Sequence, residues 1–277
     1  MVVSSEMGSL GRLAWRSIQL IMKGIEAIGG DLHPLTSVRG RPAGMRILWS
    51  RDEDGLLRGG IKRFNVEGTE FRFFFNEELD GIQRFHRRGT IYEAEELTLI
   101  AENYKGGVFV DVGANIGNHS IYAAKLLHAP KVVAFEPVAL SADLFEINVA
   151  LNGCGDRVVL HRVGLSDQPC RASPVIIQHN LGGTRLAQGD GPIEIVRGDD
   201  ILESEAVSFI KIDTEGYELK VLAGLKQVIA KCQPTLFVEV ENAQITAFRD
   251  FCDASGYRIS GERRRYEGCT NFLAQPK

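Results

Sequence analysis

Short apolar runs and amphipathic stretches alternate through the second half of the chain. The apolar runs, which predict buried strands, are Val108–Val112, Val132–Phe135, Val158–Val163, Val207–Ile212 and Thr235–Val240. Most of them are separated by predicted helices at about residues 118–128, 139–151, 217–231 and 243–255. Strands that alternate with helices indicate parallel crossovers and a doubly wound α/β sheet.

The end of the chain breaks this alternation. Tyr257–Arg263 and Cys269–Gln275 are two predicted strands joined by a short polar loop, which indicates an antiparallel hairpin. The sequence therefore predicts a mostly parallel sheet of seven strands that ends in this hairpin. Such an ending distinguishes the fold from a plain dinucleotide-binding domain.

The N-terminal third has a different pattern. Residues 9–28 carry apolar side chains at every third or fourth position, which predicts an amphipathic helix, and residues 30–60 have the composition of a linker. Ile61–Val66 and Glu70–Phe75 flank a Glu-Gly-Thr turn and predict a β-hairpin. A predicted helix over Tyr92–Tyr104 leads into the sheet.

These patterns divide the chain into three parts. We expect an N-terminal amphipathic helix and linker over residues 1–60, a β-hairpin and lead-in helix over 61–105, and the domain of the sheet over 106–277. The helix over residues 9–28 is expected to pack on this domain or on a second copy of the chain. Contact with a membrane surface is the alternative, because the basic residues of this helix precede its acidic residue.

Composition and charge limit the classes of function. Hydrophobic residues make up 44% and charged residues 25% of the chain, which is ordinary for a soluble globular protein. The net charge of −4 argues against a nucleic acid as substrate or partner, since proteins that bind it usually carry a basic face.

The five cysteines include no CxxC pair, so neither a zinc site nor a disulfide framework is expected. No apolar run approaches the ~20 residues of a membrane span and no signal peptide is recognisable, so we expect a cytoplasmic protein.

The most informative segment, Asp111–Asn118 (DVGANIGN), covers the end of the first strand of the sheet and the turn after it. Its glycines allow a sharp turn into a helix and a close approach of a ligand to the backbone. A nicotinamide dinucleotide requires Gly-x-Gly-x-x-Gly, but Asn115 and Asn118 replace the second and third glycines. The carboxylate of Asp111 would repel a pyrophosphate, whereas it suits the ammonium of a methionine moiety. The turn therefore favours S-adenosylmethionine over NAD.

Acidic residues also follow the next two strands. Glu136 ends the second strand, where a carboxylate can accept hydrogen bonds from both ribose hydroxyls of an adenosine. Asp167 follows the third strand and could accept a hydrogen bond from the adenine amino group, although it could equally cap a turn. Glu136 and the glycine turn, on consecutive strands, together predict an adenosine-containing cofactor.

The order of these segments resembles one protein family. VFVDVGANIG, AFEP, LFEINVALN, IKIDTEGYELKVLAGL and LFVEVEN follow one another, preceded by Tyr92-Glu93, and residues 90–275 are similar to the FkbM family of methyltransferases. The resemblance implies a class I methyltransferase (Rossmann-like) fold with residues 106–277 as the catalytic domain. It also implies S-adenosyl-L-methionine as the cofactor and O-methylation of a sugar, glycan or secondary metabolite.

The resemblance also suggests roles for individual residues by their position in the motifs. The residues that would hold the cofactor are Asp111, Gly113, Asn115, Gly117 and Glu136. Asp213, Glu215 and Gly216 would lie at the tip of the fourth strand, beside the methyl group that is transferred.

Methyl transfer to a hydroxyl also needs a group that accepts the hydroxyl proton. Ligands bind at the carboxyl ends of parallel strands, where Asp213 and Glu239 are expected. We rank Asp213 first as this base, Glu215 second and His179 third. His179 begins a polar segment, residues 179–184, that we expect to be a loop of the substrate pocket.

Other interpretations stay open from the sequence alone. Asp213 with Glu241-Asn242 loosely resembles the oxygen ligands by which some O-methyltransferases hold magnesium, but helix capping by Asn242 explains it equally well, and no metal is expected. The fold could be catalytically silent and serve as a partner-binding scaffold. An NAD-dependent dehydrogenase is disfavoured by Asn115 and Asp111.

Overall fold

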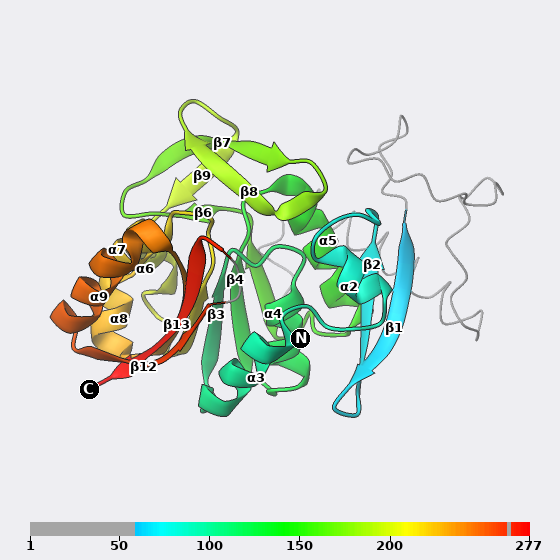
Figure 1. Cartoon of the computed structure of the whole chain (residues 1–277), viewed down its shortest axis with the longest axis horizontal. Coiled ribbons are helices and arrows are strands. Elements are labelled where there is room, and N and C mark those ends of the chain that lie inside the picture. The colour runs from blue at the N-terminus through cyan, green and yellow to red at the C-terminus, as the bar shows by residue number, and fades with distance from the viewer. Residues whose placement is uncertain (1–58, 265–266) are drawn as a thin grey trace.

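The core of the protein is a seven-stranded sheet with the strand order β12-β13-β11-β10-β3-β4-β5 (Figure 1). Parallel pairing joins β3 (Val108–Val112), β4 (Lys131–Phe135), β5 (Val158–His161), β10 (Val207–Ile212) and β11 (Thr235–Glu241). β13 (Cys269–Pro276) runs antiparallel to both of its neighbours, β11 and β12 (Tyr257–Arg263). The predicted fold class, a mostly parallel α/β sheet with an antiparallel C-terminal hairpin, is confirmed.

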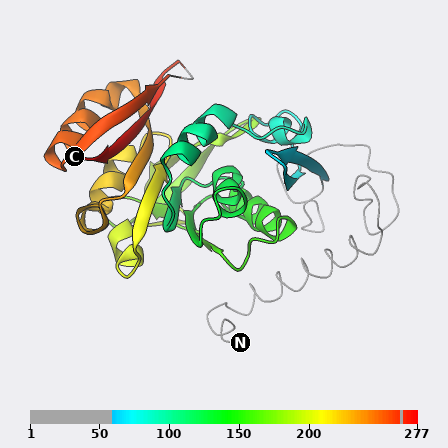
Figure 2. The ribbon, with the colours of Figure 1, turned by 90° about the horizontal axis from the view of Figure 1, so that it is seen from below.

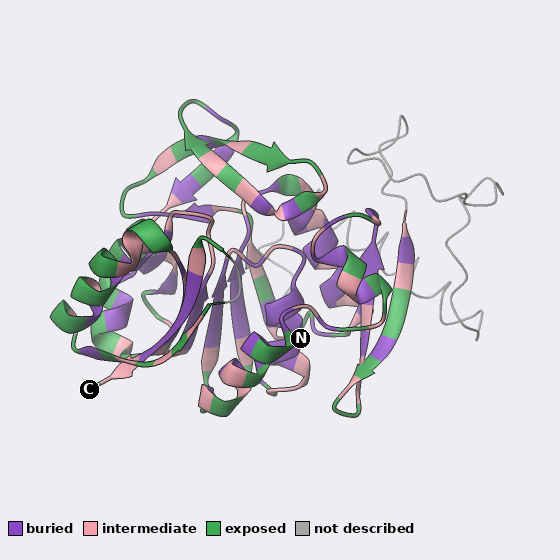
Figure 3. Cartoon of the chain, in the orientation of Figure 1, coloured by how far each residue is buried: buried purple, intermediate pink, exposed green. Residues whose placement is uncertain are grey.

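Helices cover both faces of the sheet. The first face carries α3 (Ala94–Asn103), α4 (Asn118–Lys125) and α5 (Ala139–Leu151). The second carries α6 (Gly198–Leu202), α7 (Glu218–Gly224), α8 (Lys226–Cys232) and, after a short 3-10 turn at Asn242–Gln244, α9 (Ile245–Ala254). Successive strand residues point to opposite faces, so Phe109 packs in one buried cluster and Val110 in the other. Because both faces of these strands are buried (Figure 3), the strands are continuous apolar runs in the sequence.

The predicted single helix over residues 217–231 is two helices. It breaks at Leu225, whose backbone angles (φ −109°, ψ 12°) leave the helical region. Just before the break, Gly224 packs against another backbone, and a Cβ added to it would lie 2.0 Å from the carbonyl oxygen of Ser166. The break therefore lets this chain segment approach the loop after β6 closely.

The predicted β-hairpin is confirmed as β1 (Gly60–Val66) paired with β2 (Thr69–Phe75). Phe71 and Phe73 enter the same buried cluster as α3 and α4. The hairpin is also held to α5, since the side-chain oxygen of Asn148 accepts a hydrogen bond from the Phe74 amide at 2.7 Å. A short helix, α2 (Gln83–Arg87), follows. The hairpin and the C-terminal strands lie at opposite ends of the molecule (Figure 2).

A second sheet, absent from the sequence prediction, lies between β5 and β10 in the chain. It joins β6 (Gly164–Leu165), β9 (Ile193–Val196), β7 (Cys170–Ile177) and β8 (Asn180–Gln188) in that order. The prediction of a loop at residues 179–184 is therefore wrong, because all of these residues except His179 belong to β8. Two adjacent glycines and partly exposed side chains removed the apolar alternation by which a strand is recognised.

The computed structural model describes residues 59–264 and 267–277 of the chain. The helix predicted over residues 9–28, with its predicted partner or membrane contact, lies outside the described residues, as does the predicted linker up to residue 58. Among the helices that are described, none is both long and apolar enough to cross a membrane.

Candidate active site

A cavity of about 390 Å³ opens at the carboxyl ends of β3, β4, β10 and β11. The direction in which strands are added to the sheet changes at β3. The next strands in the chain, β4 and β5, lie on one side of β3, whereas β10 and β11 lie on its other side. Ligands of doubly wound sheets bind at such a reversal. Residues 180–184 of β8 line the cavity as well, so the second sheet covers the ends of the strands.

The turn after β3 is built for close packing. Gly113 has φ +76°, and an added Cβ would lie 1.8 Å from the carbonyl oxygen of Asp213. Asn115 also has a left-handed backbone (φ 49°), and its amide donates to Glu136 Oε2 at 2.8 Å. Gly117 (φ +91°) is the N-cap residue of α4 and packs against Phe145, outside the cavity wall. The turn therefore presents Gly113 and Asn115 to the cavity, while Gly117 shapes the start of the helix.

Alanine at Gly113 is expected to destabilise the protein more than alanine at Gly256. Both glycines have left-handed φ values near +76°, but nothing lies within 4 Å of a Cβ at Gly256. The backbone strain alone costs about 1–2 kcal/mol, so Gly256→Ala measures it, and Gly113→Ala adds the clash with Asp213. Chemical denaturation of both variants checks this difference in unfolding free energy. Equal losses would show that the turn at Gly113 is not tightly packed.

Glu136 is buried at the end of β4 and lines the cavity. Its two carboxylate oxygens accept hydrogen bonds from the amides of Asn115 and Val138, both at 2.8 Å. Burial raises the pKa of Glu136 to about 7, and these amide bonds partly oppose the rise. The carboxylate is thus fixed beside the glycine turn, where the sequence placed it.

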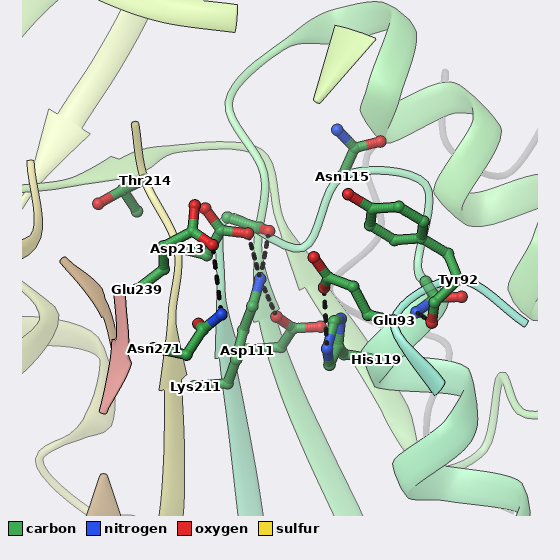
Figure 4. Close-up of polar contacts among 12 residues, drawn as sticks. Tyr92, Glu93, Asp111, Asn115, His119, Lys211, Asp213, Thr214, Glu239 and Asn271 are labelled. Carbon is green, nitrogen blue, oxygen red and sulfur yellow. Dashed lines mark hydrogen bonds and ion pairs between the residues drawn. The ribbon is translucent and has the colours of Figure 1, made fainter. Parts of the chain in front are cut away.

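Asp111, by contrast, lies beneath the cavity and not in its wall. Its side chain is completely buried and accepts a hydrogen bond from Ser120 Oγ at 2.7 Å. Lys211 of β10 lies above it, with Nζ at 3.3 Å from Asp111 Oδ1 and 3.6 Å from Asp213 Oδ2 (Figure 4). Lys211 Nζ also donates to the Gly113 carbonyl at 2.9 Å. Burial lowers the pKa of Lys211, but the two aspartates outweigh it and raise the pKa above its usual value.

Three carboxylates gather at the ends of β10 and β11. Asp213, Glu215 and Glu239 all line the cavity, and Asn271 Nδ2 donates to Glu239 at 3.5 Å (Figure 4). Burial and then the charge of Asp213 raise the pKa of Glu215 to about 7 and that of Glu239 to about 8. Groups with pKa values near neutral can exchange protons under physiological conditions. Glu239 is therefore a further candidate for the base, beside Asp213 and Glu215, which we ranked first and second from the sequence.

These raised pKa values predict that the ligand-free protein becomes less stable as the pH rises. A carboxyl group whose pKa is raised by folding binds more protons in the folded chain, so the unfolding free energy falls between its ordinary and its folded pKa. For Glu239 this window runs from 4.5 to about 8. Thermal denaturation from pH 5 to pH 8.5 should therefore show a Tm that decreases less in Glu239→Gln than in the wild type.

The matched control is Glu262→Gln, which removes a half-exposed carboxylate beside Arg249. We expect this variant to keep the wild-type dependence of Tm on pH. An unchanged slope in Glu239→Gln would mean that Glu239 does not titrate in this window.

The structure adds a buried acidic residue that the sequence analysis did not single out for the site. Glu93 lines the cavity, and its Oε2 lies 3.6 Å from Nε2 of His119, which also lines the cavity (Figure 4). The preceding residue, Tyr92, is tied to the glycine turn because Asn118 Nδ2 donates to its carbonyl at 3.0 Å. The Tyr92-Glu93 pair in the family resemblance was a sequence signal for Glu93. The sequence analysis found no comparable signal for His119.

Besides Asp111 and Gly117, three more predicted residues lie outside the cavity wall. Asp167 is exposed and accepts a hydrogen bond from Ser166 Oγ at 3.0 Å. His179 occupies the turn between β7 and β8, where its Nδ1 lies 3.5 Å from Glu77 Oε1. Gly216 is next to the wall residue Glu215 but is not part of the wall. The structure therefore does not bring the predicted adenine contact or the third-ranked base into the cavity.

Within residues 59–264 and 267–277, no group of three His, Cys, Asp or Glu side chains is arranged to hold a metal ion. Glu241, considered as a ligand from the sequence, instead pairs with Arg185 at 2.5 Å.

Comparison of the chain with known proteins identifies its family. The model of the methyltransferase FkbM domain matches residues 111–259, just over half of the chain. Hexuronic acid methyltransferase AglP of Haloferax volcanii is 33% identical, over 52% of this chain and 59% of the relative. Methyltransferase sdnD of Sordaria araneosa is 26% identical, over 43% of this chain and 60% of the relative. The chain thus spans about three fifths of the length of these relatives.

Among solved structures, methyltransferase FkbM from Methylobacillus flagellatus KT is 22% identical, with a TM-score of 0.45 over 60% of this chain and 43% of that chain. The family is shown by the domain match, which includes the glycine turn, Glu136 and the strand ends that carry the carboxylates. The chain belongs to the family of FkbM methyltransferases.

Proposed function

We propose that this protein transfers the methyl group of S-adenosylmethionine to a hydroxyl of a sugar, glycan or secondary metabolite. The observation that carries the proposal is the charge of the cavity. Among the residues that the structure describes, the wall holds five carboxylate side chains but only two from lysine or arginine, Arg84 and Lys211. The carboxylates belong to Glu93, Glu136, Asp213, Glu215 and Glu239. Such a wall suits a cofactor that carries a sulfonium and an ammonium group and repels a pyrophosphate.

The residues around the glycine turn fit this cofactor. Glu136 would accept hydrogen bonds from the ribose hydroxyls, and the backbone of Gly113 and Asn115, which line the cavity, would lie against the cofactor. Since Glu136 ends β4 and Asp213 follows β10, a cofactor whose ribose meets Glu136 would extend across the end of β3 toward Asp213. The methyl group would then face the carboxylates at the ends of β10 and β11.

When bound, the cofactor supplies a methyl carbon whose bond to sulfur breaks as the bond to the acceptor oxygen forms. The task of the protein is to align that oxygen with the methyl carbon, to exclude water and to take up the hydroxyl proton. Asp213 is our candidate for the proton acceptor, because it lines the cavity and its ion pair with Lys211 holds it in place. Glu215 and Glu239, which line the same cavity, would then receive the proton from Asp213.

A uronic acid is our first choice among acceptors, since a relative in the same family is named as a hexuronic acid methyltransferase. The test is incubation of the full chain with methyl-labelled S-adenosylmethionine and a panel of uronic acids, neutral sugars and glycosylated metabolites, followed by mass spectrometry. We expect one labelled methyl group on an acceptor oxygen. Label on a nitrogen or carbon would contradict O-methylation, and no transfer to any hydroxyl compound would count against the proposed class of acceptor.

A further inference from the structure

We propose that Glu93 holds the α-ammonium group of S-adenosylmethionine, an inference that rests on the proposed function. The sequence placed Asp111 in this role. In the structure, however, Asp111 is completely buried below the cavity wall, and its charge is offset by Lys211. A bound ammonium would therefore need another anion within the wall.

Glu93 lies on the side of the cavity where this group is expected. A cofactor that meets Glu136 with its ribose would direct its methionine part past β3 toward β10. Figure 4 shows the Glu93 carboxylate between His119, on the first turn of α4, and the head group of Lys211, on β10. Consistent with this position, the charge of Glu93 contributes to the raised pKa values of Lys211 and Glu239.

The local backbone holds Glu93 in an unusual conformation. Its φ of 56° is left-handed, a region that costs a residue with a side chain about 1–2 kcal/mol. Glu93 is the N-cap residue of α3, and its carboxylate does not cap the helix. The carboxylate instead faces the cavity, although the residue is only 7% exposed. A buried carboxylate directed at a ligand site is suited to a cationic group of the ligand.

The anchoring of Glu93 also favours a binding role. Asn118 connects the start of α4 to the segment before α3, since its Nδ2 donates to the Tyr92 carbonyl and its Oδ1 accepts a hydrogen bond from Nε2 of His86 at 2.8 Å. His119, the next residue, contacts the Glu93 carboxylate. The glycine turn and Glu93 are thus held in one rigid arrangement, as two contacts to a single ligand require.

Binding calorimetry with three probes tests the assignment without measuring turnover. S-adenosylhomocysteine carries the ammonium, its deaminated analogue lacks only that group, and methylthioadenosine lacks the whole amino-acid part. Glu93→Gln keeps the size of the side chain and removes its charge. We expect this variant to bind S-adenosylhomocysteine about 10- to 150-fold more weakly, as for the loss of a hydrogen bond between charged groups, and to bind the other two probes within about twofold of the wild type.

Two further variants make the test specific. Glu95→Gln, in the first turn of α3 but outside the cavity wall, should leave the affinities for all three probes unchanged. Glu93→Asp retains the carboxylate and tolerates the left-handed backbone better, so it should fold and still prefer S-adenosylhomocysteine to the deaminated probe.

Three outcomes would overturn the assignment. The first is an unchanged affinity of Glu93→Gln for S-adenosylhomocysteine. The second is a Glu93→Gln variant that loses as much affinity for methylthioadenosine as for S-adenosylhomocysteine. The third is wild-type protein that binds S-adenosylhomocysteine and its deaminated analogue equally well, which contradicts an ammonium site but leaves the proposed function standing. Wild-type protein that binds none of the probes, nor S-adenosylmethionine, would contradict the proposed function itself.

Discussion

Asparagine in place of Asp213 is expected to lower the rate of methyl transfer by about 10²- to 10⁴-fold, the usual contribution of a general base. The amide cannot accept the hydroxyl proton, but it has nearly the same size as the carboxyl. Lys211 would keep its contacts with Asp111 and with the Gly113 carbonyl, so the fold should persist. Initial rates with labelled cofactor at saturating acceptor measure the loss, and calorimetry should give a dissociation constant for S-adenosylmethionine within a few-fold of the wild type.

Two neighbouring variants identify which carboxylate acts. Glu241→Gln, outside the cavity wall and paired with Arg185, should retain nearly full activity. Glu239→Gln should reduce the rate less than Asp213→Asn does. If Glu239→Gln abolishes turnover and Asp213→Asn does not, the base is Glu239 and our ranking is wrong.

Alanine in place of Glu136 is expected to weaken S-adenosylmethionine binding by about 1.5–3 kcal/mol, which corresponds to about 10- to 150-fold in affinity. The carboxylate would accept hydrogen bonds from the ribose hydroxyls, and it also fixes the turn by accepting those of Asn115 and Val138. Glu136→Gln keeps an oxygen acceptor and should lose less affinity than the alanine variant. Calorimetric titration of both variants provides the measurement.

A control for this variant is Glu146→Ala on α5, which removes a partly exposed carboxylate that pairs with Arg162. It should bind the cofactor as the wild type does. An unchanged affinity in Glu136→Ala would show that the ribose does not lie at the end of β4, and the orientation of the cofactor proposed above would then be wrong.

The parts of the fold that the sequence predicts well are those whose pattern has a single physical cause. β3, β4 and β10 are apolar because both faces of the sheet are covered by helices, so their runs are unmistakable. Gly113 and Glu136 could be placed because a turn after one strand and an acidic end of the next must meet at the same edge of a parallel sheet.

Features that depend on tertiary contacts escaped sequence reasoning. Lys211 interrupts an apolar run and gave no sign that it would neutralise Asp111 beneath the cavity. Glu93 lines the cavity because contacts of Asn118 and His119 hold the segment before α3 against the start of α4. β8 was mistaken for a loop because a strand that covers a cavity has a partly solvated face. Asp167 and His179 stand near the strand ends in the sequence, but neither residue lines the cavity.

Calorimetric titration of the purified chain with S-adenosylmethionine tests most directly the central claim, that the chain binds this cofactor. The account predicts saturable binding of one cofactor per chain, with a dissociation constant of about 1 μM to 1 mM, the range in which enzymes commonly meet their substrates. The cavity at the ends of β3, β4 and β10 would then hold the cofactor for which its acidic wall is suited. No detectable binding with the cofactor at several millimolar would contradict the account.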